Sequence, residues 1–261
     1  ALLDMPNISN QQARSLALTA QGFQKKFSGL EEVLETTHVF QLDSVNVFER
    51  AHLLPAFSRM GAYPLADFEK WAFGEPQIAE EWAHCAGLVS KTDWALFEFR
   101  RHESLARQSV QTMLKEQAKT ISWIKAELAS NGPMTVSRFE HDQNKRRGNW
   151  WGWSEVKLLL ERLYDAGLLV SAGRTKFSRL YALPEQVELP KPTLTQETQK
   201  LALVQKSVAA IGVGTAEDIA RMAAMAEEAM RSGALGISTS RTLGHKVPDG
   251  RPVPGTWAEA D

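Results

Sequence analysis

The chain has 261 residues, with 30 Lys and Arg against 31 Asp and Glu, and a single cysteine, Cys85. This length suits one large domain or two to three small ones. One cysteine excludes an internal disulfide and a zinc cluster built from thiolates, and it fits a reducing compartment. Because the net charge is −1, any contact with nucleic acid must come from a local basic patch. We find no apolar run long enough to span a bilayer and no secretory signal, so we expect a cytoplasmic protein without membrane contact.

Three short helical patterns occupy the first sixty residues. A helix is predicted over 9–22, because Ser9 is a good N-cap and a glycine follows the small-residue stripe. Apolar spacing predicts a second helix over 30–37 and a third over about 43–54. Pro55 then permits only the first turn of another helix. Three short helices in this order are typical of a helix-turn-helix core.

Between the second and third helix, Gln41 and Asp43 lie two residues apart among apolar neighbours. In an extended segment this spacing places both on one side of the backbone, while Phe40 and Leu42 face a core on the other side. A carboxylate beside an amide can orient a water and stabilise a positive charge, as hydrolysis through a cationic transition state requires. Asp43 is equally suited to cap the helix that follows, which is the commoner role for an aspartate at this position. Spacing alone does not decide between these interpretations.

A second polar cluster surrounds His84, which lies in an apolar setting next to Trp82. His84 is either a functional group or a core histidine whose ring is hydrogen-bonded to a backbone carbonyl. Cys85 is expected to be a small buried apolar residue rather than a nucleophile. The helix predicted over 94–103 adds local positive charge through Arg100, Arg101 and His102.

From residue 117 onward the pattern is helix, short helix, helix and β-hairpin. We expect these elements over 117–130, 135–140 and 154–166, with β-runs over 168–174 and 177–183 around a basic turn. This is the element order of a winged helix. Basic residues of the loop before the third helix and of the wing tip could contact DNA phosphates, namely Lys145, Arg146, Arg147, Arg174, Lys176 and Arg179. The alternative for these residues is a solvated basic loop that carries no partner.

The remaining part begins with a Pro-rich linker over 184–193 and an amphipathic helix over 196–211. A third helical domain would begin here, but its pattern is not completed.

Several motifs now combine: Gln11 to Gly22, Gln41-Leu42-Asp43-Ser44-Val45-Asn46-Val47, Arg50-Ala51-His52, Phe57-Ser58-Arg59, Trp82-Ala83-His84 and Gly148 to Trp153. Together they resemble the YcaQ/AlkZ family, the bacterial winged-helix DNA glycosylases that unhook crosslinked or alkylated bases. The resemblance covers most of residues 9–219, and the motifs occur in the family's order.

This resemblance implies a mainly α fold with small β-hairpins, built from tandem winged-helix domains. The implied first domain spans 1–116 and carries the Gln-x-Asp motif, the second spans 117–189, and an incomplete third spans 190–220. A β-barrel-like region, which completes the DNA-binding surface in the family, would be missing. The chain is thus expected to be a truncated glycosylase whose own activity is open.

The family's catalytic signature is Gln-x-Gln or Gln-x-Asp, and Gln41-Leu42-Asp43 matches the second form. By resemblance, Asp43 and Gln41 would position the water and stabilise the sugar cation as the glycosidic bond of an alkylated or interstrand-crosslinked purine breaks. An N7-alkylguanine is already positively charged, so its departure needs no strong general acid.

Other site residues follow by the same resemblance. Trp82, His84 and Asn46 would line the substrate pocket, and Arg50, His52 and Arg59 would join the basic loop and wing in DNA contact. The implied partner is double-stranded DNA, the expected state is a monomer, and no metal or organic cofactor is implied.

Two features depart from the family pattern. Glu81 stands where relatives tend to have an aromatic residue, and Cys85 stands where they tend to have a glutamate, so the base preference is left open if these positions line the pocket. Residues 221–261 resemble instead an internal piece of an N-acyl-D-amino-acid deacylase, with one αβ step of a barrel. One step cannot assemble a metal site, and His245 lacks companion ligands. We therefore expect a foreign, poorly packed tail, joined near Ala220 by a frameshift, an assembly error or a gene fusion.

Three functions stay open on the sequence. The first is the DNA glycosylase. The second is a non-catalytic winged-helix DNA-binding module that contacts the duplex through the 154–166 helix and the wing. The third, a deacylase, is disfavoured because the tail is too short for the fold.

Overall fold

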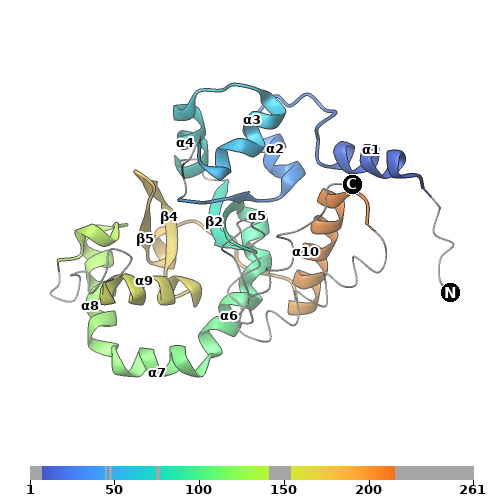
Figure 1. Cartoon of the computed structure of the whole chain (residues 1–261). Helices are drawn as coiled ribbons and strands as arrows, with labels where there is room; N and C mark the ends of the chain where they lie inside the picture. Colours follow the sequence, from blue (N-terminus) through green and yellow to red (C-terminus); the bar gives the residue numbers. More distant parts are fainter. Residues whose placement is uncertain (1–7, 45, 47–48, 75–76, 141–153, 215–261) are drawn as a thin grey trace, which may run out of the picture.

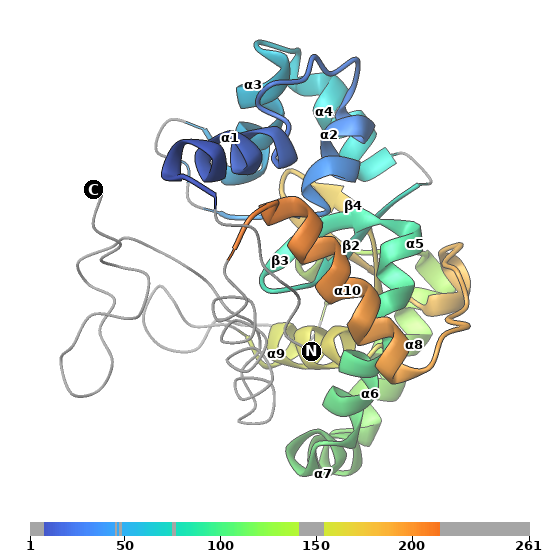
Figure 2. The same cartoon turned by 90° about the vertical axis from the view of Figure 1, so that its right-hand side faces the viewer.

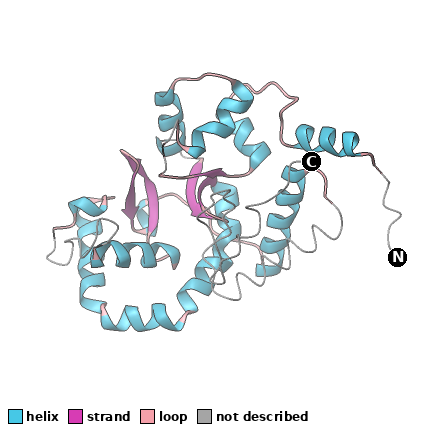
Figure 3. Ribbon diagram, in the orientation of Figure 1, coloured by secondary structure: helices cyan, strands magenta, loops and turns pink. Residues whose placement is uncertain are grey.

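The computed structural model describes residues 8–44, 46, 49–74, 77–140 and 154–214. This part of the chain is mainly helical with two small antiparallel sheets, as the sequence predicts (Figures 1 and 3). Within these ranges, no helix combines the length and apolar character that a membrane span requires. The basic loop and tryptophans of 141–153, the continuation after Gly214 and the 221–261 tail lie outside the described residues.

The first helix begins at a capping box, as its sequence predicts. The Ser9 hydroxyl accepts from the backbone N–H of Gln12, and the Gln12 side chain accepts in return from the backbone N–H of Ser9. Pro55 lies in the first turn of a later helix, where its missing N–H leaves no hydrogen bond unmade. The helical elements of this region are α1 (Asn10–Ala20), α2 (Leu30–Thr37), η1 (Ala51–Leu53), α3 (Leu54–Met60) and α4 (Leu65–Gly74).

The prediction of a helix directly after Asp43 is wrong. In the described residues between Asp43 and η1, Asn46 and Arg50 instead form a backbone bridge, and the first helical element after Asp43 among these residues is η1. The physical reason is that the preceding strand pairing continues: the backbone N–H of Leu42 donates to the carbonyl of Ala86 at 2.7 Å, which keeps this segment extended. Asp43 therefore does not cap a helix here.

A three-stranded antiparallel sheet lies beneath α2 and α4. It consists of β1 (Phe40–Gln41), β2 (Ile78–Trp82) and β3 (Ala86–Ser90), in the order β1-β3-β2. Phe40 is fully buried, and its ring stacks on Phe68 of α4 with centroids 6.1 Å apart. Gly87 pairs with Gln41, and a Cβ there would lie 2.6 Å from the Val39 Cγ2. A glycine at this position thus permits β1 to approach β3.

A second core forms around α9. Leu160 and Leu163 of α9 are fully buried together with Ile124 and Leu128 of α8 and Tyr181 of the hairpin. The elements from β3 onward are α5 (Lys91–Trp94), η2 (Ala95–Phe97), α6 (Glu98–Ala106), α7 (Gln108–Glu116), α8 (Ala118–Asn131), η3 (Val136–Arg138), α9 (Glu155–Asp165), β4 (Val170–Thr175), β5 (Ser178–Ala182) and η5 (Pro184–Gln186).

The β4–β5 hairpin lies between α9 and α4 (Figure 1). Its two turn residues, Lys176 and Phe177, both have positive φ, at 47° and 65°, which is the backbone of a type I′ turn. Gly173 has φ 102°, and a Cβ there would lie 2.7 Å from the Phe73 carbonyl oxygen. The hairpin therefore packs directly on the C-terminal end of α4, backbone against backbone.

The last described helix, α10 (Gln196–Ile211), returns to the N-terminal part of the chain. It lies against α1, η2 and α6 (Figure 2). Its Gln199 side chain is buried and accepts from the backbone N–H of Phe99 at 3.3 Å. At the other end, a Cβ on Gly212 would lie 2.2 Å from the Ala20 Cβ.

A buried ion network, called here the Glu80 network, joins β2 to the hairpin. The Glu80 side chain is 2% exposed and accepts two N–H groups from Arg174 at 2.6 and 3.0 Å, and two from Arg179 at 2.6 and 2.9 Å. The Ser171 hydroxyl adds a bond at 3.0 Å. Burial alone would raise the pKa of Glu80, but Arg179 and Arg174 outweigh it and hold that pKa at about 2. The carboxylate is therefore charged and fully bonded.

The network extends into α9 through a second carboxylate. Arg179 donates to Glu161 at 2.5 Å, and Glu161 also accepts from the Tyr181 hydroxyl at 2.6 Å and pairs with Lys157. The Tyr164 hydroxyl donates to the Glu80 backbone carbonyl at 2.9 Å. The hairpin, α9 and β2 thus share one set of bonds.

Glu80→Gln should lower the free energy of unfolding by about 3–5 kcal/mol, because the buried Arg174 loses its Glu80 counter-charge and Arg179 keeps only Glu161. Urea unfolding at pH 7 measures this loss. Glu188→Gln is the matched control, since Glu188 is exposed and its substitution should change stability by less than about 0.5 kcal/mol. Equal effects of the two substitutions would contradict a supporting role for the Glu80 network.

Candidate functional site

The Gln41–Asp43 segment has the alternation that its spacing predicts. Phe40 and Leu42 are 0% and 7% exposed, whereas Gln41 and Asp43 are only half-buried. The apolar pair is held in the core beneath α4, so both polar side chains stand on the opposite side of the chain. The side chains of Gln41 and Asp43, which are expected to act together, therefore lie on the same side of the segment.

The turn between β2 and β3 lies beside this segment. Gln41 pairs with Gly87, and two further steps along the antiparallel register bring Asp43 opposite Cys85. Burial, and then the negative charge of Asp43, raise the pKa of the Cys85 thiol to about 11. Cys85 therefore stays a neutral thiol, as the sequence predicts, and its Sγ lies 3.3 Å from the exposed His84 ring at Nε2. Two motifs about forty residues apart are brought together, and the expectation of His84 as a core histidine is wrong.

Trp82 is the last residue of β2, directly before this turn, and is half-buried. Its backbone carbonyl accepts from Arg100 at 2.8 Å, and its indole Nε1 is buried with no hydrogen-bond partner in the part of the chain that the structure describes. Asn46, the third predicted pocket residue, is exposed in the loop that follows Asp43.

Glu81 has a role inside the fold. It is buried, its carboxylate pairs with Arg101 of α6, and it accepts from the backbone N–H of Trp82 at 2.7 Å. Arg101 in turn lies over the Trp94 ring at 3.8 Å. Because neighbouring strand residues face opposite sides, Glu81 binds α6 while Glu80 binds the hairpin. Glu81, which stands where relatives tend to have an aromatic residue, is therefore paired with Arg101 inside the fold.

His52 is not exposed as a DNA contact would have to be. It is 4% exposed and lies between Phe68 and Phe177, with ring centroids at 5.5 and 5.6 Å. Burial, and then the nearby Arg50 and Arg174, lower the pKa of His52 to about 4. The ring is therefore neutral at physiological pH. Arg50, two residues before His52, is half-buried, and its guanidinium lies 3.8 Å from the Phe177 ring centroid.

The arginines expected at the wing tip are also turned inward. Arg174 and Arg179 are bound to Glu80, with side chains only 11% and 5% exposed. The expectation that they reach DNA phosphates is corrected, because the buried Glu80 and the half-buried Glu161 bind them inside the fold. Lys176 is exposed at the turn, whereas Lys145, Arg146 and Arg147 lie outside the described residues.

Arg59 is used for structural contacts. Its Nε donates to the Gln21 carbonyl at 2.7 Å, another N–H donates to the Pro55 carbonyl at 3.0 Å, and the guanidinium lies 4.5 Å from the Phe23 ring centroid. These contacts join the end of α1 to α3.

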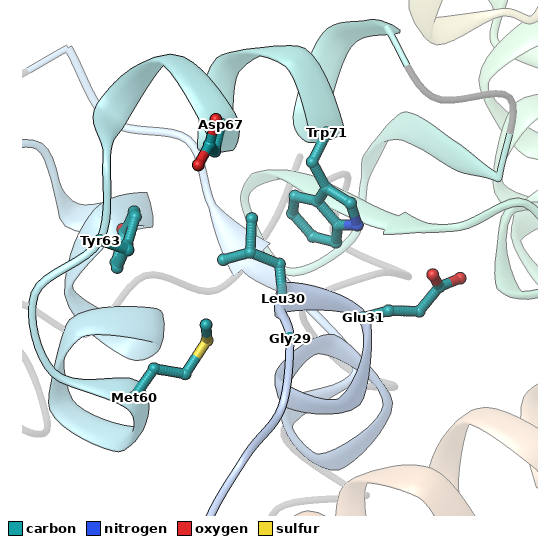
Figure 4. Close-up of a pocket in the computed structure, with 7 residues that line it drawn as sticks. All are labelled: Gly29, Leu30, Glu31, Met60, Tyr63, Asp67 and Trp71. Atoms are coloured by element: carbon teal, nitrogen blue, oxygen red, sulfur yellow. The ribbon is translucent and has the colours of Figure 1, made fainter.

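A cavity of about 340 Å³ lies between α2, α3 and α4 (Figure 4). Leu30, Met60, Tyr63 and Trp71 form its apolar wall, and Asp67 and Glu31 stand at its edge. The Phe40 ring packs against Trp71, so the cavity and the Asp43 carboxylate are on opposite sides of β1. None of the predicted site residues lines it. Among the described residues, no three His, Cys, Asp or Glu side chains gather as metal ligands would.

A family model described as "DNA glycosylase AlkZ-like" matches residues 34–259. The chain belongs to the AlkZ-like DNA glycosylase family. This membership supports a DNA glycosylase function and implies DNA as the partner. No solved structure matches the chain. Because the match runs on through residues 221–259, it gives no support to the deacylase resemblance of that segment.

Two residues of this AlkZ-like chain gain roles that the sequence analysis missed. Phe177 covers His52 and Arg50, and Arg100 binds the Trp82 carbonyl. One signal for Phe177 was present: an aromatic residue occupies a two-residue turn where glycine and asparagine are usual. For Arg100 no local signal exists, because its partner comes from another element.

The AlkZ-like fold should lose stability in mild acid because of His52. Its pKa is depressed from 6.5 to about 4, so the unfolded chain takes up the proton first, and the stabilisation is lost as pH falls through this window. Between pH 7.5 and 4.5 the native chain should lose about 2–3 kcal/mol more than His52→Phe, which keeps a stacking ring but does not titrate. Urea unfolding at both pH values measures the difference. Parallel losses in the two proteins would contradict it.

Proposed function

We propose that this chain is a DNA glycosylase that hydrolyses the N-glycosidic bond of alkylated or interstrand-crosslinked purines of the N7-alkylguanine type in double-stranded DNA. Asp43 and Gln41 are its catalytic residues. The observation that carries the proposal is that both side chains stand on one open side of a segment whose alternate residues are locked in the core, inside the family match.

The surroundings of Asp43 suit stabilisation of a cation. Its neighbours Cys85 and His52 are both uncharged at physiological pH. As the glycosidic bond breaks, its electron pair leaves with the base and positive charge develops on the sugar, where a nearby carboxylate lowers the energy. Asp43 and Gln41 orient a water that adds to the sugar carbon, and the proton of this water passes to the Asp43 carboxylate and from there to solvent. An N7-alkylated base is already cationic, so it leaves without a general acid.

The DNA would approach from the side of the chain that carries Gln41 and Asp43. Arg50 and Lys176, with Lys145, Arg146 and Arg147, contact phosphates, while Trp82, His84 and Asn46 line the substrate pocket. The domains are tandem winged helices over 1–116 and 117–189, followed by the beginning of a third over 190–220. The succession α8, η3, α9 and hairpin supports the second of these.

A non-catalytic winged-helix DNA reader receives less support. Such a module needs an exposed recognition helix and a free wing. In α9 the exposed side chains are Leu158 and Arg162, and the remaining residues are buried or half-buried. The wing arginines are engaged by Glu80. This arrangement favours a surface built around Asp43 over one built around α9.

Asp43→Asn should slow base release by about 10²–10⁴-fold, because a neutral amide cannot stabilise the sugar cation. The measurement is single-turnover release from duplex DNA carrying N7-methylguanine or a nitrogen-mustard crosslink. Gln41→Ala should cause a smaller loss in the same assay. Affinity for the duplex should change by less than about threefold in either variant, since neither residue supplies positive charge.

Asp67→Asn is the matched control, because it makes the same chemical change at an exposed aspartate on α4, on the other side of Phe40. It should release base at the native rate. Equal rates for the native chain and Asp43→Asn would exclude Asp43 as the catalytic group. DNA binding without release by the native chain would favour the binding module.

A further inference from the structure

We propose that Phe177, at the tip of the β4–β5 hairpin, is a positioning residue that holds Arg50 in a fixed orientation beside the Gln41–Asp43 segment. The inference rests on the function proposed above and extends it to the proposed second domain, residues 117–189, called here the second unit. Residues 1–116 are called the first unit. The second unit contributes to the site through the placement of an aromatic ring.

The geometry is a continuous stack of side chains. Phe68 of α4 contacts the His52 ring at 5.5 Å, and His52 stacks on Phe177 at 5.6 Å with 11° between the planes. The Arg50 guanidinium lies 3.8 Å from the centroid of Phe177, within the range of a cation–π contact. The Arg174 guanidinium also lies near this ring, at 4.7 Å. The ring of Phe177 therefore connects the core of the first unit to the loop that follows Asp43.

The backbone at Phe177 indicates that this position is held in place. A φ of 65° is uncommon for a bulky residue and costs energy that a glycine would not incur. The conformation is fixed by Arg174, which donates to the Phe177 carbonyl at 2.7 Å while its other N–H groups bind Glu80. Glu80 thus anchors Arg174, Arg174 anchors the turn, and the turn presents the ring.

Arg50 follows Asp43 in a segment whose described residues form no helix. Its backbone is bridged to Asn46. A free arginine side chain has rotamer entropy that is lost when it is ordered against a phosphate or a reacting sugar. Stacking on Phe177 orders it before DNA arrives. It also restrains the loop that carries Asp43.

Phe177→Leu tests the role of the ring, because leucine keeps an apolar side chain in the core but has no aromatic face. Single-turnover base release at saturating enzyme should fall about tenfold, since small misplacements of catalytic groups are costly. Affinity for the duplex should fall by a smaller factor than the rate, because Arg50 is one of several proposed phosphate contacts. Phe177→Tyr should restore the native rate, and Ser178→Ala, an exposed neighbour on β5, should not alter it.

The dependence on Arg50 separates positioning from general support of the fold. In an Arg50→Ala background, Phe177→Leu should cause little further loss, because both changes remove one interaction. Fully additive losses would overturn the proposal. A rate for Phe177→Leu equal to that of the native chain would do the same.

A second readout does not need activity. In NMR spectra, the Arg50 side-chain resonances should carry ring-current shifts that vanish in Phe177→Leu and persist in Phe177→Tyr. Unchanged Arg50 resonances in Phe177→Leu would overturn the positioning role. Absence of base release by the native chain, with these shifts present, would count against the glycosylase function and leave the stack established.

Discussion

The arrangement of this chain depends on the buried ion pairs that Glu80 forms with Arg174 and Arg179. A charge that is removed from water is tolerated only when its partners satisfy it, and Glu80 obtains four N–H groups from two arginines of the hairpin and a hydroxyl from Ser171. Neither β2 nor the hairpin could bury these groups alone. Glu81, its neighbour on the strand, repeats the solution on the opposite face with Arg101 of α6. One short strand therefore holds the hairpin on one side and a helix on the other.

This arrangement changes how the second unit can serve an AlkZ-like DNA glycosylase. The arginines that would give a free wing its affinity for phosphates are used to neutralise Glu80 and Glu161. The same bonds fix the turn at Phe177 and bring its ring against His52 and Arg50. The second unit therefore has fewer exposed positive charges, and its Phe177 ring contacts Arg50 in the segment that follows Asp43.

The proposed site places the Asp43 carboxylate beside two uncharged groups. Burial keeps Cys85 as a thiol and His52 as a neutral ring at physiological pH. A reaction with a cationic leaving group needs a carboxylate near the sugar more than it needs an acid. The strand register, which brings Asp43 opposite the turn with His84, supplies the groups beside it.

Local signals in the sequence determined the helices and the alternation at the motif. The bounds of α2 and α10 were predicted to the residue, and the sides taken by Phe40 and Asp43 followed from the two-residue period of a strand. The tertiary structure alone decided that Arg174 and Arg179 turn inward, because their partner lies 94 and 99 residues away in the chain. It also decided that the segment at Asp43 is extended rather than helical, since the backbone N–H of Leu42 donates to the carbonyl of Ala86. Caps and periodicity are written in neighbouring residues, whereas the neutralisation of a buried charge and the register of a strand depend on which distant segments meet.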